Sequence, residues 1–168
     1  DEKEIRIHAK VVDARLFSHK LALYRTIRCS LTENMFEIED RIKNEGDDAY
    51  PVEVLYHMNM GYPLLSEKSL VYIGSDRTLP RNERAAERIG EWDRMRRPEA
   101  GFEEQRYYHK FSKEGKAGIF QPEEGLGLMI LFDSENLNYF TEWKMMGVRD
   151  YVLGLEPGNC HPDGRKKM

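Results

Sequence analysis

The chain has 168 residues, of which 40% are hydrophobic and 33% are charged. This is the length of one ordinary domain, and the apolar fraction is large enough for a hydrophobic core, which excludes a disordered chain. The 30 Asp and Glu residues outnumber the 26 Lys and Arg residues, giving a net charge of -4. An acidic chain lacks the basic surface that binds phosphate backbones, so nucleic acid is not expected as a partner.

The two cysteines, Cys29 and Cys160, lie far apart and form no C-x-x-C pair. This spacing favours neither a disulfide framework nor a zinc site, and it is typical of a reducing compartment. No apolar run approaches the roughly 18–20 residues that cross a membrane, and the first residues contain no hydrophobic signal core. We therefore expect a cytoplasmic protein that makes no membrane contact.

The predicted elements of the first third of the chain are short strands separated by polar turns. Apolar and polar residues alternate, which is the pattern of half-buried strands, at residues 5–9, 21–27 and 35–42. Residues 51–60 are apolar on both faces, so we expect a central strand of a sandwich there.

The character of the sequence changes between residues 81 and 94, which are rich in helix-forming residues and poor in β-branched ones. We expect one short helix or a charged loop there, outside the sheets. Strand patterns then return, separated by segments rich in Gly, Pro, Asn and Asp, at residues 105–111, 117–120, 126–132, 139–145 and 151–156. Short strands, frequent turns and little helix predict an all-β, antiparallel β-sandwich.

Two residues are candidates for proton transfer. His57 lies in the middle of the apolar run, where it is either a buried imidazole bonded to a backbone carbonyl or a functional group. The other four histidines are expected at the surface. Glu156 ends the apolar strand pattern and precedes Pro157, so we expect it in a loop, either as a site carboxylate or as an acid facing water.

Several aromatic and basic side chains suggest contacts with a saccharide, whose C–H patches pack on aromatic rings. The candidates are Trp143, Lys144, Arg165 and Trp92, with core packing as the alternative for Trp143. Lys144 follows Trp143 directly, so the two point to opposite faces of one strand unless a bulge intervenes. Nucleotide-binding, metalloprotease and metal-ligand spacings do not occur, which predicts a site without metal or cofactor.

Four stretches of the sequence resemble the galactose mutarotase-like superfamily, and more narrowly a branch of aldose 1-epimerase homologues. They are LYHMNMGYPLL at residues 55–65, EWK at 142–144, YVLGLEPGN at 151–159 and PDGR at 162–165. The resemblance implies a supersandwich fold and a monosaccharide or sugar derivative as substrate. Because the chains of that superfamily are longer, it also implies that residues 1–168 form a single β-sandwich domain, the C-terminal portion of a longer mutarotase-like domain.

The resemblance assigns His57 as general acid and Glu156 as general base. We further predict that the substrate is bound by Asn59, Tyr62, Trp143, Lys144, Asn159 and Arg165. The sheet edges left open without an N-terminal half would be closed by that half or by a second copy in a homodimer.

Three functions are compatible with these observations. The first is an aldose 1-epimerase-like isomerase that opens and recloses the sugar ring by acid and base catalysis. The second is a non-catalytic carbohydrate-binding β-sandwich, and the third is a structural or oligomerisation half-domain. The enzyme requires His57 and Glu156 to face one concave surface, because both must reach protons of the same sugar.

Overall fold

The computed structural model describes residues 3–163 of the chain. The contacts divide the chain into two compact units, Asp1–Val52 and Glu53–Met168. In the described part, each unit is built on antiparallel strands. The prediction that residues 1–168 form a single domain stays a prediction.

The first unit is a three-stranded antiparallel sheet with the order β1-β2-β3. Its strands, which agree with the predicted alternation, are β1 (Glu4–Ala14), β2 (Lys20–Ser30) and β3 (Phe36–Asn44). The register places Ile7, Ile27 and Ile38 in one row, so one face of the sheet is largely apolar. Arg25 and Asp40 form an ion pair on that same face, with Nη2 2.6 Å from Oδ2.

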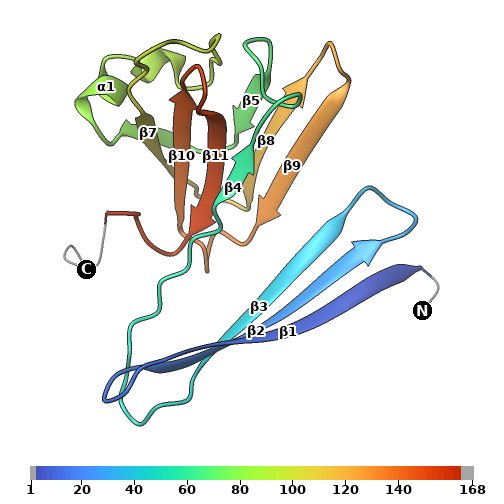
Figure 1. The fold of residues 1–168 in the computed structure, drawn as a ribbon, viewed down its shortest axis with the longest axis vertical. Coiled ribbons are helices and arrows are strands. Elements are labelled where there is room, and N and C mark those ends of the chain that lie inside the picture. The colour runs from blue at the N-terminus through green and yellow to red at the C-terminus, as the bar shows by residue number, and fades with distance from the viewer. Residues whose placement is uncertain (1–2, 164–168) are drawn as a thin grey trace. The chain divides into compact units, whose positions relative to one another are not determined.

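The second unit is an antiparallel β-sandwich, which confirms the predicted all-β class (Figure 1). Its five-stranded sheet has the order β4-β11-β10-β7-β6, and its three-stranded sheet has the order β5-β8-β9. The strands are β4 (Met58–Met60), β5 (Leu70–Ile73), β6 (Arg77–Pro80), β7 (Gln105–Lys110), β8 (Gly115–Gln121), β9 (Leu126–Phe132), β10 (Tyr139–Met146) and β11 (Tyr151–Gly158).

The hydrophobic core fills the space between these two sheets. Leu153 and Leu155 of β11 and Phe140 of β10 face Ile119 of β8 and Phe132 of β9 in one buried cluster. The rings of Phe132 and Phe140 stack with centroids 5.5 Å apart, so the two sheets are in direct contact. Burial of each such side chain contributes roughly 1.5–3 kcal/mol to the free energy of unfolding. This packing fixes the position of the five-stranded sheet.

Residues 51–60 do not form the central strand that the sequence predicts. Only Met58–Met60 are a strand, and β4 lies at the edge of the five-stranded sheet, beside β11. The residues before it follow β11 through single contacts, the bridge of Leu55 with Gly158 and the bond from Tyr56 N to the Pro157 carbonyl. The prediction was wrong because β10 already occupies the other side of β11, which leaves this segment on the outside.

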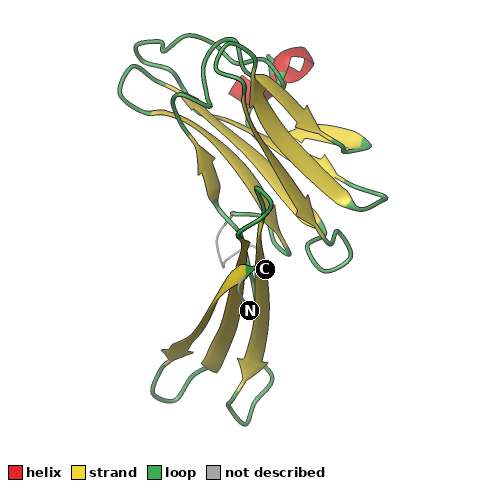
Figure 2. Cartoon of the chain, turned by 90° about the vertical axis from the view of Figure 1, so that its right-hand side faces the viewer, coloured by secondary structure: helices red, strands yellow, loops and turns green. Residues whose placement is uncertain are grey.

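The segment near residues 81–94 contains the predicted short helix, α1 (Glu83–Ala86), followed by a 3-10 turn, η1 (Ile89–Glu91) (Figure 2). Asn82 caps α1, because its side-chain oxygen accepts a hydrogen bond from Ala85 N at 2.9 Å. No helix within residues 3–163 is long and apolar enough to span a membrane.

Two of the histidines predicted at the surface are buried, and that prediction was wrong. His19 contacts Asp13, with Nε2 2.9 Å from Oδ1, and its ring packs on Tyr50. His109 shares the inner face of β7 with Tyr107. Its Nδ1 lies 3.0 Å from Ser75 Oγ, and its Nε2 lies 3.3 Å from Glu142 Oε2. Polar groups lie beside both imidazoles, so burial is tolerated where the residue type alone predicts exposure.

Lys144 holds the segment after η1 in place. Its ammonium donates hydrogen bonds to the carbonyls of Glu91 (3.2 Å), Trp92 (2.7 Å) and Arg94 (2.8 Å). Burial lowers the pKa of Lys144, and Glu142 is the main group that opposes this shift. Three backbone oxygens therefore accept hydrogen bonds from the buried ammonium of Lys144.

We expect Lys144→Met to lower the free energy of unfolding by about 3 kcal/mol or more, because three backbone carbonyls lose the buried ammonium that donates to them. Both tryptophans, Trp92 and Trp143, lie in the second unit, so urea unfolding followed by tryptophan fluorescence measures the loss. The matched control is Lys116→Met, which removes an exposed lysine paired with Glu114 at the surface and should cost less than about 1 kcal/mol. Equal effects of the two substitutions would contradict this role of Lys144.

Candidate active site

The register of β10 and β11 separates the candidate residues between the two faces of the five-stranded sheet. Thr141 lies opposite Glu156, and Trp143 lies opposite Gly154. Because side chains alternate along a strand, these four residues share the outer face, away from the core. Lys144 lies opposite Leu153 and points into the core. Trp143 and Lys144 therefore do not line one pocket, as the alternation predicts.

His57 and Glu156 meet on the outer face. The ladder pairs Asn59 with Gly154 and Met58 with Leu155, which brings His57 next to Glu156 across the strands. The His57 Nε2 atom lies 3.0 Å from Glu156 Oε1. The structure thus brings the predicted acid and base into direct contact, although they are 99 positions apart in the sequence.

The two members of this pair differ in their access to solvent. The His57 side chain is 46% exposed, whereas the Glu156 side chain is 2% exposed. His57 is thus not a buried imidazole bonded to a backbone carbonyl. Glu156 was expected in a loop, but it lies inside β11 with its carboxylate beneath the imidazole. A ligand approaching the outer face would meet His57 first and the carboxylate below it.

Burial of Glu156 raises the pKa of its carboxyl group above the ordinary value of 4.5, because the charged form loses its hydration. The charges of His57 and Arg106 act in the opposite direction and favour the carboxylate. A buried carboxyl group beside an accessible imidazole is an arrangement that can exchange protons with a bound molecule.

An aromatic side chain lies beside this pair. The Trp143 indole stands edge to face against the His57 imidazole, with centroids 5.5 Å apart. Its Nε1 donates a hydrogen bond to Glu104 Oε2 at 2.9 Å, and Arg106 Nη2 donates to the same oxygen at 3.0 Å. The indole is therefore held in one orientation by a charged pair, and it is half-buried on the outer face and does not pack in the core.

Sequence reasoning missed Glu104 and Arg106 as residues of this face. The register places Arg106 directly opposite Trp143, and Glu104 precedes β7 by one residue. The alternation in residues 105–111 could have shown that Arg106 and Tyr108 point away from the core. It could not have shown that β7 lies next to β10, which is what brings them to Trp143.

The other residues predicted to bind substrate do not all lie beside Trp143. Asn59 is exposed on the outer face opposite Gly154, and Tyr62 is 82% exposed in the loop after β4. Arg165 lies outside the described residues. Trp92 does not join Trp143, because its ring packs against buried His109 on the core side.

Asn159 positions the backbone that carries His57. Its side-chain Oδ1 accepts a hydrogen bond from Val54 N at 2.7 Å, and its own N–H donates to the Val54 carbonyl at 3.0 Å. The side chain that the sequence assigns to substrate is thus engaged with the protein backbone. Together with the bond from Tyr56 N to the Pro157 carbonyl, it ties the segment before β4 to the end of β11.

The residues after β11 add a second polar cluster to the outer face. Asp163 Oδ1 accepts hydrogen bonds from Arg81 Nε (2.6 Å) and Tyr108 OH (3.0 Å). Tyr108 lies opposite Thr141, which in turn lies opposite Glu156, so this cluster shares a row with the carboxylate. Burial, with the hydrogen bond to Asp163, raises the pKa of Tyr108 to about 12, so its phenol stays protonated near neutral pH.

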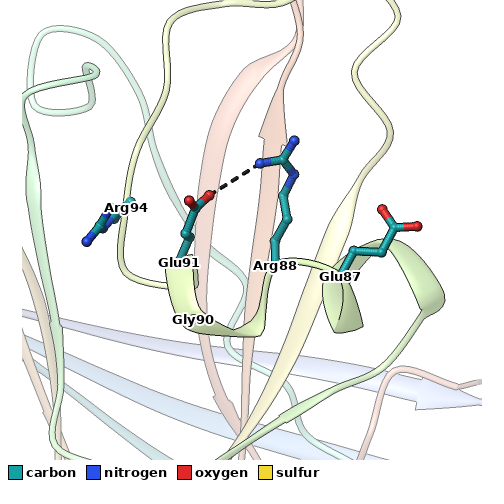
Figure 3. A pocket seen from close by; sticks show the side chains of 5 residues that line it. All are labelled: Glu87, Arg88, Gly90, Glu91 and Arg94. Carbon is teal, nitrogen blue, oxygen red and sulfur yellow. Dashed lines mark hydrogen bonds and ion pairs between the residues drawn. The ribbon is translucent and has the colours of Figure 1, made fainter.

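A separate hollow of about 610 Å³ lies on the helical segment, lined by Glu87, Arg88, Gly90, Glu91 and Arg94 (Figure 3). None of the predicted site residues lines it. Glu91 in its wall is paired with Arg88 at 3.3 Å and with Arg96 at 2.8 Å, so its charge is already compensated. Residues 3–163 contain no cluster of three or more His, Cys, Asp or Glu side chains placed to hold a metal ion, and both cysteines are free.

Comparison with known proteins gives two matches to this chain. The model of a family described as a domain of unknown function, DUF4432, matches residues 1–168. A crystal structure of a protein described as a putative aldose 1-epimerase, from Klebsiella pneumoniae subsp. pneumoniae, superposes with a TM-score of 0.88 at 25% identity. The match covers 94% of this chain and 43% of that chain, so this chain spans less than half the length of its structural neighbour. Comparison with the curated proteins gives no match.

We expect Asn159→Ala to release the segment that carries His57. The Val54 amide loses its acceptor, so its hydrogen exchange should become at least about tenfold faster. Amide exchange followed by NMR measures this directly. Asn136→Ala is the matched control, because the Asn136 side chain bonds to Asp133 within a turn away from the outer face. Unchanged protection of Val54 in Asn159→Ala would show that Asn159 does not hold the segment.

Proposed function

The chain belongs to the family described as a domain of unknown function, DUF4432, and we propose that it acts as an aldose 1-epimerase-like isomerase. In this proposal it interconverts the anomers of a monosaccharide or sugar derivative. The observation that carries the proposal is the contact of His57 with Glu156 on the outer face, 3.0 Å apart and beside Trp143. The likeness to a protein described as a putative aldose 1-epimerase supports the same class of reaction.

The reaction needs one base and one acid. The Glu156 carboxylate takes the proton of the anomeric hydroxyl while the His57 imidazolium protonates the ring oxygen, and the bond between C1 and the ring oxygen breaks. The open-chain aldehyde rotates about the C1–C2 bond. Reclosure from the other face returns both protons, so the enzyme ends in its starting state with the opposite anomer.

The short distance between the two groups suits this chemistry. The anomeric hydroxyl and the ring oxygen are bonded to the same carbon, so the base and the acid that serve them must also lie close together. A sugar replaces the direct contact of His57 with Glu156 by two contacts of its own. The exposed imidazole gives access from solvent, and the buried carboxylate is reached once the imidazole makes room.

Trp143 supplies the surface on which the sugar rests. An indole binds the C–H face of a pyranose, and here its orientation is set by the hydrogen bond to Glu104. Arg106 lies opposite Trp143 and Asn59 lies opposite Gly154 on the outer face, and in this proposal both form hydrogen bonds with hydroxyl groups of the sugar. This division of roles leaves Lys144 and Asn159 as structural residues.

We expect Glu156→Gln to slow anomer interconversion by at least about 100-fold, because the amide cannot accept the proton of the anomeric hydroxyl. The side chain keeps its shape, so sugar binding should persist. Saturation-exchange NMR on a panel of neutral and acidic monosaccharides measures both properties in one experiment. The matched control is Glu124→Gln, at an exposed turn position, which should keep the rate of the unaltered protein.

Unchanged turnover in Glu156→Gln would overturn the proposal. Sugar binding by the unaltered protein without any rate enhancement would support a carbohydrate-binding β-sandwich instead. In that case Trp143→Ala should remove binding, whereas Glu156→Gln should not.

The dependence of the rate on pH follows from the pKa of Glu156. Burial raises this pKa above 4.5, and the base works only when ionised, so on the acid side of the profile the rate should rise with pH through a midpoint above that of an ordinary glutamate. The rate should fall again at higher pH, because the mechanism also needs the protonated imidazole of His57. Arg106→Gln removes a cation that lowers the pKa, so this substitution should move the midpoint further up. Polarimetric rates from about pH 4 to about pH 8 test both statements, and a midpoint that Arg106→Gln leaves in place or moves down would contradict them.

A further inference from the structure

Gly154 occupies a position in β11 where a strand ordinarily carries a side chain. The residue lies in the interior of β11, opposite Trp143 on one side and Asn59 on the other. Glycine inside a strand costs stability, because it has no side chain to pack and loses more backbone freedom than other residues. Such a residue often marks a point where another group comes close to the backbone.

The group that comes close is the carboxylate of Glu156. Gly154 and Glu156 share the outer face, because they are two positions apart on one strand. A Cβ at position 154 would overlap Glu156 Oε1, and it would lie 3.2 Å from the carboxyl carbon and 3.3 Å from Trp143 Cβ. The Glu156 side chain thus lies along the strand, in the volume that a side chain at position 154 would fill.

We propose that Gly154 is a positioning residue for the reaction, because its missing side chain provides the space in which the Glu156 carboxylate lies beneath His57. This inference rests on the proposed function for its kinetic consequence. Its structural content is independent of that function: the depth of the carboxylate, and its contact with His57 Nε2 at 3.0 Å, depend on the absence of a single methyl group.

The same geometry predicts what an added methyl group would do. The overlapping atom is the end of a flexible side chain, so the carboxylate can rotate away from position 154 while β11 keeps its pairing. The carboxylate would then leave its position beneath His57 and become more exposed to water. Gly154→Ala is therefore expected to displace the base without unfolding the sandwich.

Two measurements test the inference. In Gly154→Ala, the titration midpoint of the Glu156 carboxyl group, followed by carbon-13 NMR and assigned by comparison with Glu156→Gln, should fall toward the ordinary glutamate value because burial is lost. For anomer interconversion, kcat should fall about 10–100-fold with a much smaller change in KM, because the base is misplaced by about the size of a methyl group.

The matched control is Gly90→Ala, in η1. A Cβ at position 90 has no atom within 4 Å, and the residue lies outside the proposed site, so neither the midpoint nor kcat should change. If the Glu156 midpoint and kcat in Gly154→Ala match those in Gly90→Ala, the inference is overturned.

A double variant separates positioning from folding. In Gly154→Ala combined with Glu156→Ala, the added methyl group no longer meets a carboxylate, so the loss in thermal midpoint caused by Gly154→Ala should shrink or vanish. If Gly154→Ala alone does not fold, recovery of folding in the double variant supports the inference. An equal loss in both backgrounds overturns it, because the methyl group would then collide with something other than Glu156.

Failure of the proposed function would look different. The unaltered protein would then turn over none of the sugars tested, while the titration midpoint and the double variant would still report whether Gly154 positions the carboxylate. Activity in the unaltered protein with an unmoved midpoint in Gly154→Ala would instead preserve the proposed function and remove this inference.

Discussion

The contact between the half-exposed His57 imidazole and the buried Glu156 carboxylate is the interaction around which the outer face of the five-stranded sheet is organised. Asn159 and the Pro157 carbonyl tie the segment that carries His57 to β11. The indole of Trp143 stands against the imidazole, and Gly154 leaves room for the carboxylate. Each of these features serves to hold two proton-carrying groups at hydrogen-bonding distance at the edge of a packed sheet.

The polar and charged side chains on the two faces of this sheet differ in their exposure to solvent. On the inner face, the ammonium of Lys144 is bonded to three backbone carbonyls, and His109 meets Glu142 with both side chains removed from solvent. On the outer face, the buried carboxylate of Glu156 lies beside the half-exposed imidazole of His57. The proposed reaction uses the second arrangement.

Many residues of the outer face could be predicted from the sequence, but the residues that lie next to them on neighbouring strands could not. The stretch LYHMNMGYPLL and the glutamate in GLEPG identified His57 and Glu156 through a family resemblance, and alternation separated Trp143 from Lys144. Glu104 and Arg106 were missed because their place beside Trp143 depends on the neighbour that β7 takes in the sheet. Asn159 was assigned to substrate because a polar residue in a loop shows no sign of the backbone amide it will bond, here that of Val54.

The sequence by itself determined the local properties of this protein: its short strands, the helical segment near residues 81–94, the all-β class and the face on which each strand residue lies. These follow from the period of two along a strand and from the composition of turns, which neighbouring residues decide among themselves. The tertiary structure alone decided that only residues 58–60 of the segment 51–60 form a strand, at a sheet edge, that His19 and His109 are buried, and that the carboxylate of Glu156 lies against Gly154. Strand order and the packing of side chains from distant segments set those features, and no local pattern encodes them.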